Sequence, residues 1–204
     1  MRRPRTPGRL FVISSPSGGG KTTVVERLRQ QQPRLVRSVS VTTRPPRPGE
    51  RDGRDYQFVS LGTFRRLRRS GALLEWAKVH GAYYGTPKRS IERALAAGHD
   101  AILSIDVQGA RQIRRRFGRR AVLIFLRPPS MEQLRRRLMR RRTETAAVIR
   151  RRLAAAKREL ACRTWYDHTV VNDRFQRTIA RMQRILTSPR HDNERGTTHG
   201  TSTD

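Results

Sequence analysis

The chain has 204 residues, enough for one domain with a substantial hydrophobic core. No stretch approaches the roughly 18 apolar residues of a membrane-spanning helix, and the apolar run near the N-terminus is too short for a signal peptide. We therefore expect a cytoplasmic protein. The single cysteine, Cys162, excludes an internal disulfide and argues against a thiolate metal cluster.

The charge is strongly positive, with 46 lysine and arginine residues against 16 acidic ones and a formal net charge of +30. Such an excess can indicate a nucleic-acid partner. Only four of the basic residues are lysines, however, so we interpret the arginines mainly as solvated helix faces favoured by a coding bias. No RNA-binding motif accompanies them. Nucleic acid is not required as a partner, although the positive field permits non-specific binding and attracts anionic nucleotides.

Strand-like apolar runs and helical periodicities alternate along the chain. The predicted strands cover residues 10–14, 38–41, 56–59, 73–79, 101–105, 121–126 and 169–171. The predicted helices cover residues 22–31, 63–70, 87–97, 130–140, 146–162 and 174–186. Pro87 is placed as a first helical residue, and Ser130 opens a capping box that includes Gln133.

This alternation predicts an α/β fold with a doubly wound parallel sheet, in which ligands bind at the carboxyl ends of the strands. A polar, proline-rich loop over residues 44–55 interrupts the pattern and begins a small subdomain. We divide the chain into a basic N-terminal extension, a core with a lid, an inserted subdomain and a disordered tail: 1–9, 10–43 with 87–186 (lid about 137–152), 44–86, and 187–204.

A phosphate-binding loop is expected directly after the first strand. The run Ser15-Pro16-Ser17-Gly18-Gly19-Gly20-Lys21-Thr22 nearly matches G-x-x-x-x-G-K-[ST] in the strand–turn–helix context that this motif requires. Backbone N–H groups would cradle phosphate oxygens, Lys21 would neutralise the β- and γ-phosphates, and the Thr22 hydroxyl would ligate Mg²⁺. Ser15 replaces the first glycine of the motif, which a negative φ would accommodate.

The segments that follow resemble the GMP-binding module of guanylate kinases. They are SVSVTTRPPRPGE at residues 38–50, Gly53-Arg54-Asp55-Tyr56, Leu74-Glu75-Trp76 and Tyr83-Tyr84-Gly85-Thr86. The resemblance extends from about Leu10 to Leu186. It implies a P-loop kinase fold with a small GMP-binding insert and a helical lid. It also implies in-line transfer of the γ-phosphoryl group of ATP to GMP, with Mg²⁺ and without a covalent intermediate.

Four residues of this module suit the phosphate of GMP. Arg44 and Arg47 are planar forks that can make bidentate phosphate contacts, and Tyr56 and Tyr84 can donate hydrogen bonds to the same oxygens. Arginine is so abundant in this chain that neither arginine would be persuasive alone. Their order and spacing within the module carry the assignment.

The guanine base presents two adjacent donors, for which a carboxylate is the natural pair of acceptors. Glu75 matches the family residue with this role, and Ser40 and Thr86 match positions that hydrogen-bond the base. Asp106 follows a buried strand and could orient Mg²⁺ through water, but the resemblance places it beside guanine, which we favour. Ser104 stands where the family usually has an aspartate.

Residues of the predicted lid resemble arginines that close over ATP. Arg137, Arg141 and Arg152 match such positions, whereas Arg142 stands where the family often has glycine. Asn172 matches a position near the adenine, although a strand-end turn residue is an almost equal alternative. The resemblance thus implies an ATP site of residues 15–22, Thr23, Arg137 and Asn172, and catalytic residues Lys21, Arg44, Arg141 and Arg152.

Two other functional classes compete with this assignment. A different P-loop kinase is disfavoured by the complete GMP module, and a non-catalytic phosphopeptide-binding module is disfavoured by the presence of Lys21 and Thr22. The sequence determines neither the oligomeric state nor whether dGMP is accepted beside GMP.

Overall fold

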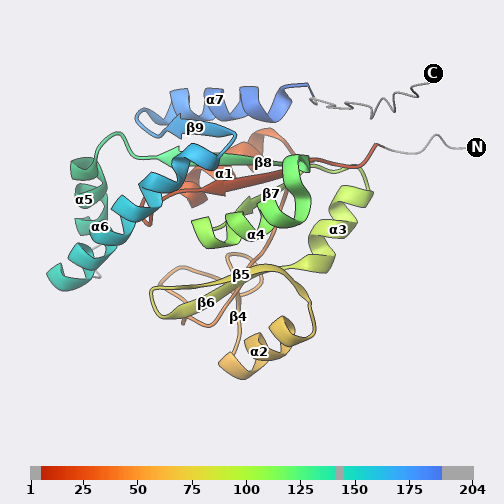
Figure 1. The fold of residues 1–204 in the computed structure, drawn as a ribbon, viewed down its shortest axis with the longest axis horizontal. Helices are drawn as coiled ribbons and strands as arrows, with labels where there is room; N and C mark the ends of the chain where they lie inside the picture. The colour runs from red at the N-terminus through yellow and green to blue at the C-terminus, as the bar shows by residue number, and fades with distance from the viewer. Residues whose placement is uncertain (1–5, 141–144, 190–204) are drawn as a thin grey trace, which may run out of the picture.

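Two β-sheets organise the computed structural model, which describes residues 6–140 and 145–189. The larger sheet has five strands in the order β2-β7-β1-β8-β9, and the smaller has four in the order β4-β3-β6-β5. In Figure 1 the larger sheet lies between layers of helices, and the smaller sheet hangs below it with helix α2.

All neighbouring strands of the larger sheet run parallel. Its strands are β1 (Leu10–Ser14), β2 (Val36–Arg37), β7 (Ala101–Ser104), β8 (Ala121–Arg127) and β9 (His168–Val171). Every residue of the central strand β1 is buried, as expected where helices cover both faces of a parallel sheet.

Helices pack on both faces of this sheet, and the core divides between them. Helices α1 (Lys21–Gln31) and α7 (Phe175–Thr187) pack against Phe11 and Ile13 on one face. Helices α3 (Lys88–Ala96) and α4 (Val107–Phe117) pack against Leu10 and Val12 on the other. The predicted doubly wound α/β sheet is confirmed, and the predicted apolar stripe of the last helix, Phe175, Ile179, Met182 and Ile185, packs into the core.

The smaller sheet is built on a β-hairpin. Strands β5 (Leu73–Val79) and β6 (Ala82–Pro87) are antiparallel and joined at His80 and Gly81, which have φ of 49° and 90°. Positive φ at both central residues is typical of a two-residue hairpin turn. The short strands β3 (Val41–Thr42) and β4 (Gln57–Phe58) extend the sheet, and α2 (Leu61–Arg69) packs on it through the buried Phe64.

Helices α5 (Met131–Met139) and α6 (Ala146–Ala161) form a pair beside the larger sheet. The Ser130 Oγ accepts a hydrogen bond from the Gln133 N–H at 3.1 Å, as its predicted role as a helix cap requires. Two short 3₁₀ helices, η1 (Gly118–Arg120) and η2 (Cys162–Trp165), complete the element order. The predicted residues Arg141 and Arg142 lie outside the described part of the chain, as does most of the predicted tail.

Several predicted elements are wrong in detail. The strand predicted at 38–41 is instead two short strands, because β2 pairs with β7 in the larger sheet while β3 pairs with β4 and β6 in the smaller. The smaller sheet thus begins at Val41, earlier than the insert boundary predicted at residue 44. Pro87 ends β6 and caps α3 from outside, because its φ and ψ of −58° and 123° are not helical.

Two of the longer elements, strand β6 and helix α4, were not predicted at all. Strand β6 was missed because its tyrosines and Thr86 were considered only as binding residues. Helix α4 was missed because three consecutive arginines obscure a stripe of Ala110, Ile113 and Phe117 that packs on the sheet. No helix in the described ranges is long and apolar enough to cross a membrane.

Candidate active site

The phosphate loop joins the carboxyl end of β1 to the first turn of α1. Gly18 and Gly20 have φ of 86° and 95°, values that side chains disfavour, and Gly20 is the residue that precedes the helix. Lys21 bends back across the loop, and its Nζ donates to the Ser15 carbonyl at 2.7 Å. Thr22 and Thr23 are exposed at the start of α1.

Ser15 fits where the motif asks for glycine. It is 3% exposed, and its hydroxyl donates to the Pro16 carbonyl at 3.1 Å. In the described part of the chain only His80, among residues other than glycine, has a positive φ. Ser15 therefore has the negative φ that a side chain needs at this position of the motif.

Asn172 supports the phosphate loop from behind. Its Nδ2 donates to the Gly19 carbonyl at 2.8 Å, and its Oδ1 accepts from the Thr178 hydroxyl at 3.2 Å. The backbone carbonyl of Asn172 accepts from Arg137 Nη2 at 2.9 Å. A Cβ on Gly20 would lie 2.5 Å from the Asn172 amide nitrogen, so the fit requires glycine. The buried Asn172 amide thus holds the loop, and a contact with adenine stays a prediction.

Helix α6 reaches the same loop from the other side. Arg152 Nη1 donates to the Ser17 hydroxyl at 3.4 Å. Glu159, two turns further along α6, also faces the loop. Burial raises the pKa of Glu159, while the nearby Lys21 ammonium and a hydrogen bond from the Ser17 N–H oppose that rise. Glu159 was not predicted as a site residue, because nothing in the local sequence distinguishes it from a surface carboxylate.

A second cluster surrounds Arg44 in the small sheet. Its two terminal nitrogens donate to the two oxygens of Glu50, each at 2.7 Å, and its guanidinium lies 5.1 Å from the centre of the Tyr56 ring. Tyr56 and Tyr84 meet edge to face, with ring centroids 6.0 Å apart. The hydrogen bond to Glu50 raises the pKa of Arg44, which is therefore a permanent cation.

Glu50 was not predicted as a site residue, although it lies within the quoted motif. Burial opposes its ionisation, but hydrogen bonds from Arg44 and from the Arg47 N–H outweigh burial and lower the pKa of Glu50. Arg47 itself is exposed. Ser40 lies just before β3, and its carbonyl accepts from the Gln57 N–H at 2.9 Å.

Glu75 is the most unusual titratable group of the site. It is 4% exposed, and its Oε1 accepts a hydrogen bond of 2.6 Å from the Thr86 hydroxyl. Burial raises the pKa of Glu75 to about 7, and the nearby charge of Asp106 adds to the rise. Asp106 caps α4, accepting from the Gly109 N–H at 2.9 Å. The structure thus brings together three predicted base-contacting residues, Glu75, Thr86 and Asp106.

Thr86 and Tyr84 are two residues apart on β6, and side chains of a strand alternate between faces. The Glu75 and Arg44 clusters therefore share one face of the small sheet. A cavity of about 330 Å³ opens beside Asp106 and Glu159, between the β5–β6 turn, α4 and α6. Its lining also includes Lys78 and Arg158.

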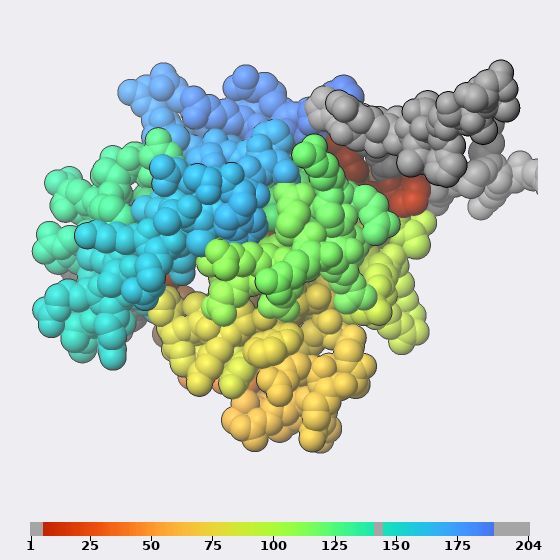
Figure 2. Space-filling model, in the orientation of Figure 1, coloured from red at the N-terminus to blue at the C-terminus, as the bar shows by residue number. Residues whose placement is uncertain are grey.

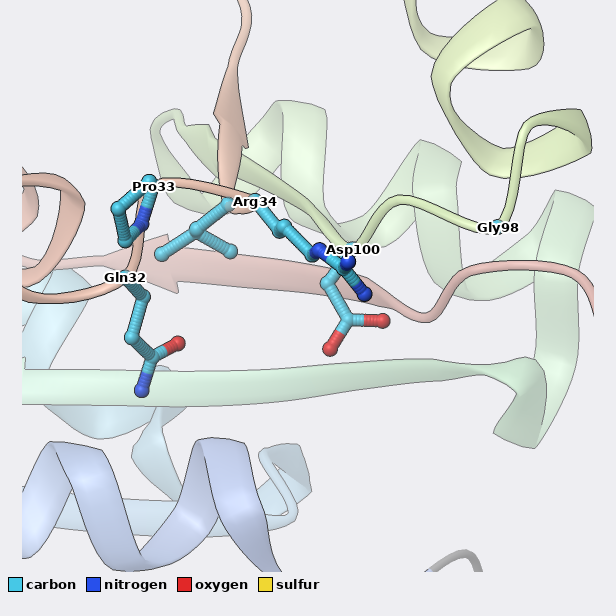
Figure 3. Close-up of a pocket in the computed structure, with 6 residues that line it drawn as sticks. Gln32, Pro33, Arg34, Gly98 and Asp100 are labelled. Carbon is cyan, nitrogen blue, oxygen red and sulfur yellow. The ribbon is translucent and has the colours of Figure 1, made fainter.

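A larger cavity of about 510 Å³ lies elsewhere, at the amino ends of the parallel strands (Figure 3). The residues that line it are Gln32, Pro33, Arg34, Leu35, Gly98 and Asp100, which precede β2 and β7. None of them is a predicted site residue. The phosphate loop lies at the opposite edge of the sheet, where ligands bind in doubly wound folds.

This fold, with a glycine-rich loop after the first strand and a lysine bent across it, defines a P-loop kinase. Comparison with known proteins narrows the class. The sequence model of the guanylate kinase family matches residues 7–189, and the chain belongs to that family. The predicted P-loop kinase fold is confirmed.

Individual relatives agree with this assignment. The chain is 45% identical over 183 residues to the guanylate kinase of Bordetella pertussis, covering 90% of this chain and 85% of the relative. It is 48% identical over 179 residues to that of Geobacter sulfurreducens, covering 88% of each chain. The crystal structure of guanylate kinase from Anaplasma phagocytophilum matches with a TM-score of 0.76 at 38% identity, over 89% of this chain and 86% of that one.

Replacing Glu75 by glutamine should stabilise the protein at alkaline pH. The folded state holds a proton on Glu75 up to about pH 7, whereas the ordinary value is 4.5, so ionising this carboxylate costs stability as pH rises between these values. We expect the advantage of Glu75→Gln in unfolding free energy to grow by about 2 kcal/mol between pH 5.5 and pH 8. Urea denaturation at both values measures it.

The exposed Glu132 on α5 provides a matched control for this experiment. Its ion pairs with Arg135 and Arg136 are solvent-exposed, so Glu132→Gln should change stability by less than about 0.5 kcal/mol at either pH. A pH-independent effect of Glu75→Gln would show that Glu75 is not a buried, proton-holding carboxylate.

Replacing Asn172 by alanine should loosen the phosphate loop. The Gly19 carbonyl and the Thr178 hydroxyl would each lose a buried partner, which costs about 1–3 kcal/mol in unfolding free energy. The KM for the nucleotide held by the loop should rise, while the KM for the second substrate should stay near that of the parent protein. Steady-state kinetics with each substrate varied in turn measures this difference, and an equal rise in both would contradict the assigned support role.

Proposed function

We propose that this chain transfers the γ-phosphoryl group of ATP to GMP, giving ADP and GDP. The observation that carries the proposal is the pairing of the buried Glu75 with Thr86, on the same sheet face as the Arg44 cluster. A buried carboxylate beside an anion-binding cluster suits a ligand with adjacent N–H donors at one end and a phosphate at the other. GMP has this form, and membership of the guanylate kinase family supports it.

The ATP side of the proposal rests on the phosphate loop. The N–H groups that begin α1 would hold phosphate oxygens, and the helix dipole favours their charge. Lys21 would exchange its bond to the Ser15 carbonyl for β- and γ-phosphate oxygens. Arg152 already touches Ser17 of the loop and would approach the transferring group. Arg137 and Arg141 complete the proposed lid set, the latter from outside the described residues.

The site fits Mg²⁺ as the partner of ATP. The Thr22 hydroxyl is exposed at the head of α1, one residue after Lys21, where an oxygen ligand is needed. In residues 6–140 and 145–189 there is no group of three or more His, Cys, Asp and Glu side chains that could hold a metal. Most ligands of the ion would therefore be phosphate oxygens and water. When bound, Mg²⁺ would supply positive charge that offsets the charge of the phosphates.

Two clusters of residues would bind GMP, one at the guanine base and the other at the phosphate. Glu75 would accept from the N1–H and 2-amino group of guanine, with Thr86 holding one of its oxygens, and Ser40 and Asp106 would contribute further base contacts. Arg44, Arg47, Tyr56 and Tyr84 would hold the phosphate. Glu50 accepts from two nitrogens of Arg44, and Nη1 also donates to the Pro45 carbonyl at 2.7 Å, so these contacts orient the guanidinium.

The protein's own contribution to the reaction is positioning and electrostatics. An oxygen of the GMP phosphate would attack the γ-phosphorus of ATP in line, and no covalent enzyme intermediate is required. Lys21, Arg44, Arg141 and Arg152 would stabilise charge on the transferring group. Closure of the α5–α6 pair over the loop would exclude water and so limit wasteful hydrolysis.

The direct test is an ADP-release assay with ATP and Mg²⁺, offering GMP, AMP, CMP and UMP separately. Turnover with GMP alone is expected, because only guanine offers a buried carboxylate two adjacent donors. Turnover with another acceptor, or none with any of the four, would contradict the proposal.

Lys21→Ala should abolish turnover without unfolding the protein. The ammonium would no longer neutralise the phosphates, and we expect a loss of at least about 10²-fold in kcat. Thermal unfolding verifies that the variant is folded. Lys157→Ala, which removes an exposed lysine from α6, is the matched control and should keep full activity. A folded and active Lys21→Ala variant would remove the phosphate loop from the mechanism.

The KM for GMP should depend on pH through Glu75. Below about pH 7 the free protein holds a proton on this carboxylate, which then offers guanine one acceptor fewer. We expect the KM for GMP to rise up to about tenfold per pH unit below that value. The phosphate of GMP titrates near pH 6 as well, so Glu75→Gln, which retains only that contribution, is the necessary comparison. Equal pH profiles for the two proteins would exclude Glu75 from guanine recognition.

A further inference from the structure

Helix α4 holds the free edge of the small sheet. Strand β5 is an edge strand, so its outward backbone groups need partners. The side-chain amide of Gln112 hydrogen-bonds both backbone groups of Trp76. Its Oε1 accepts from the Trp76 N–H at 3.2 Å, and its Nε2 donates to the Trp76 carbonyl at 2.6 Å. Gln108, one turn earlier, donates to the Lys78 carbonyl at 3.3 Å. Figure 2 shows the green helix α4 directly against the yellow hairpin.

Gly109 lies between these two glutamines, at the closest approach of α4 to Glu75. A Cβ built on Gly109 would overlap Glu75 Oε2 and would lie 3.0 Å from Glu75 Cδ and 3.3 Å from Ile105 Cδ1. The backbone of Gly109 has no positive φ and would accept any residue. The requirement for glycine here is therefore one of space and not of conformation.

The carboxylate of Glu75 has no room to yield to a side chain at this position. Thr86 holds its other oxygen at 2.6 Å, and the residue is 4% exposed. The same Gly109 donates its N–H to Asp106 at 2.9 Å. One glycine thus lies beside the Glu75 carboxylate, with no space for a Cβ between them, and donates its N–H to the Asp106 carboxylate.

We propose that Gly109 is a specificity-determining positioning residue for guanine. Gly109 has no Cβ, and Gln112 joins β5 to α4 by hydrogen bonds. Together they determine the position of the Glu75 carboxylate relative to the base. This inference rests on the proposed function, because it concerns the same guanine site. The first turn of α4 is accordingly part of acceptor recognition, although no side chain of Gly109 ever meets the ligand.

The test is Gly109→Ala, compared with Gly62→Ala. Alanine is the better helix former, so intrinsic propensity does not oppose either change. A Cβ on Gly62, in α2, would meet only Ser60 Oγ at 3.8 Å, so that control should behave as the parent protein. For Gly109→Ala we expect the KM for GMP to rise at least about tenfold, because a displaced carboxylate loses its hydrogen bonds to the base. The KM for ATP should stay within about threefold.

A second background separates this inference from the proposed function. Glu75→Asp shortens the carboxylate and frees the space that an alanine at 109 would occupy. Gly109→Ala should therefore lower the melting temperature in the parent protein and have little effect in the Glu75→Asp background. If Gly109→Ala does not fold alone, Glu75→Asp should restore folding.

These melting experiments need no substrate, so they report the contact even if GMP is not the acceptor. An unchanged KM for GMP in a folded Gly109→Ala protein would overturn the inference. So would an equal loss of stability, or of folding, in both backgrounds.

Discussion

A carboxylate buried where the small sheet meets helix α4 constrains the whole acceptor half of the molecule. Burying an ionised group is costly unless it is hydrogen-bonded, and among the described residues Glu75 accepts hydrogen bonds from the Thr86 side chain and backbone, with Asp106 adding repulsion. The fold tolerates this cost because β6 presents Thr86 directly opposite Glu75 in the strand register. Under the proposed function a bound guanine would supply the missing donors, so the burial that destabilises the free protein would also favour this ligand over others.

The phosphate-loop half of the site also contains a buried polar side chain, and this side chain packs against a glycine. Asn172 is a buried polar side chain that donates a hydrogen bond to the phosphate loop, and its amide leaves no room for a Cβ on Gly20. Glu75 and Gly109 stand in the same relation on the other side. In each pair a polar group is fixed by a backbone that lacks a side chain, which positions it more tightly than a contact between two flexible side chains would.

Much of this arrangement is readable from the sequence, for identifiable reasons. The parallel sheet and the phosphate loop follow from apolar runs and a spacing whose chemistry is local. The burial of Glu75 could not be predicted in this way, because a lone glutamate in an alternating strand is more often exposed. Helix α4 was not predicted because its arginines obscure the apolar stripe. The hydrogen bonds of Gln112 to the Trp76 backbone could not be predicted either, because they depend on β5 being an edge strand. What escapes prediction is contact between segments distant in the chain, and those contacts determine the position of each functional group.

The excess of arginine gives the protein a net positive charge that affects the binding of its anionic substrates. Most ion pairs of the described residues are partly exposed and contribute little stability individually. The uncompensated charge, +30 for the whole chain, repels itself in the compact state. ATP and GMP are both anions, so their binding relieves this repulsion as well as forming local contacts. We therefore expect ligand binding to stabilise this protein more than it would a neutral protein of the same fold, and the gain in stability to shrink as salt screens the field.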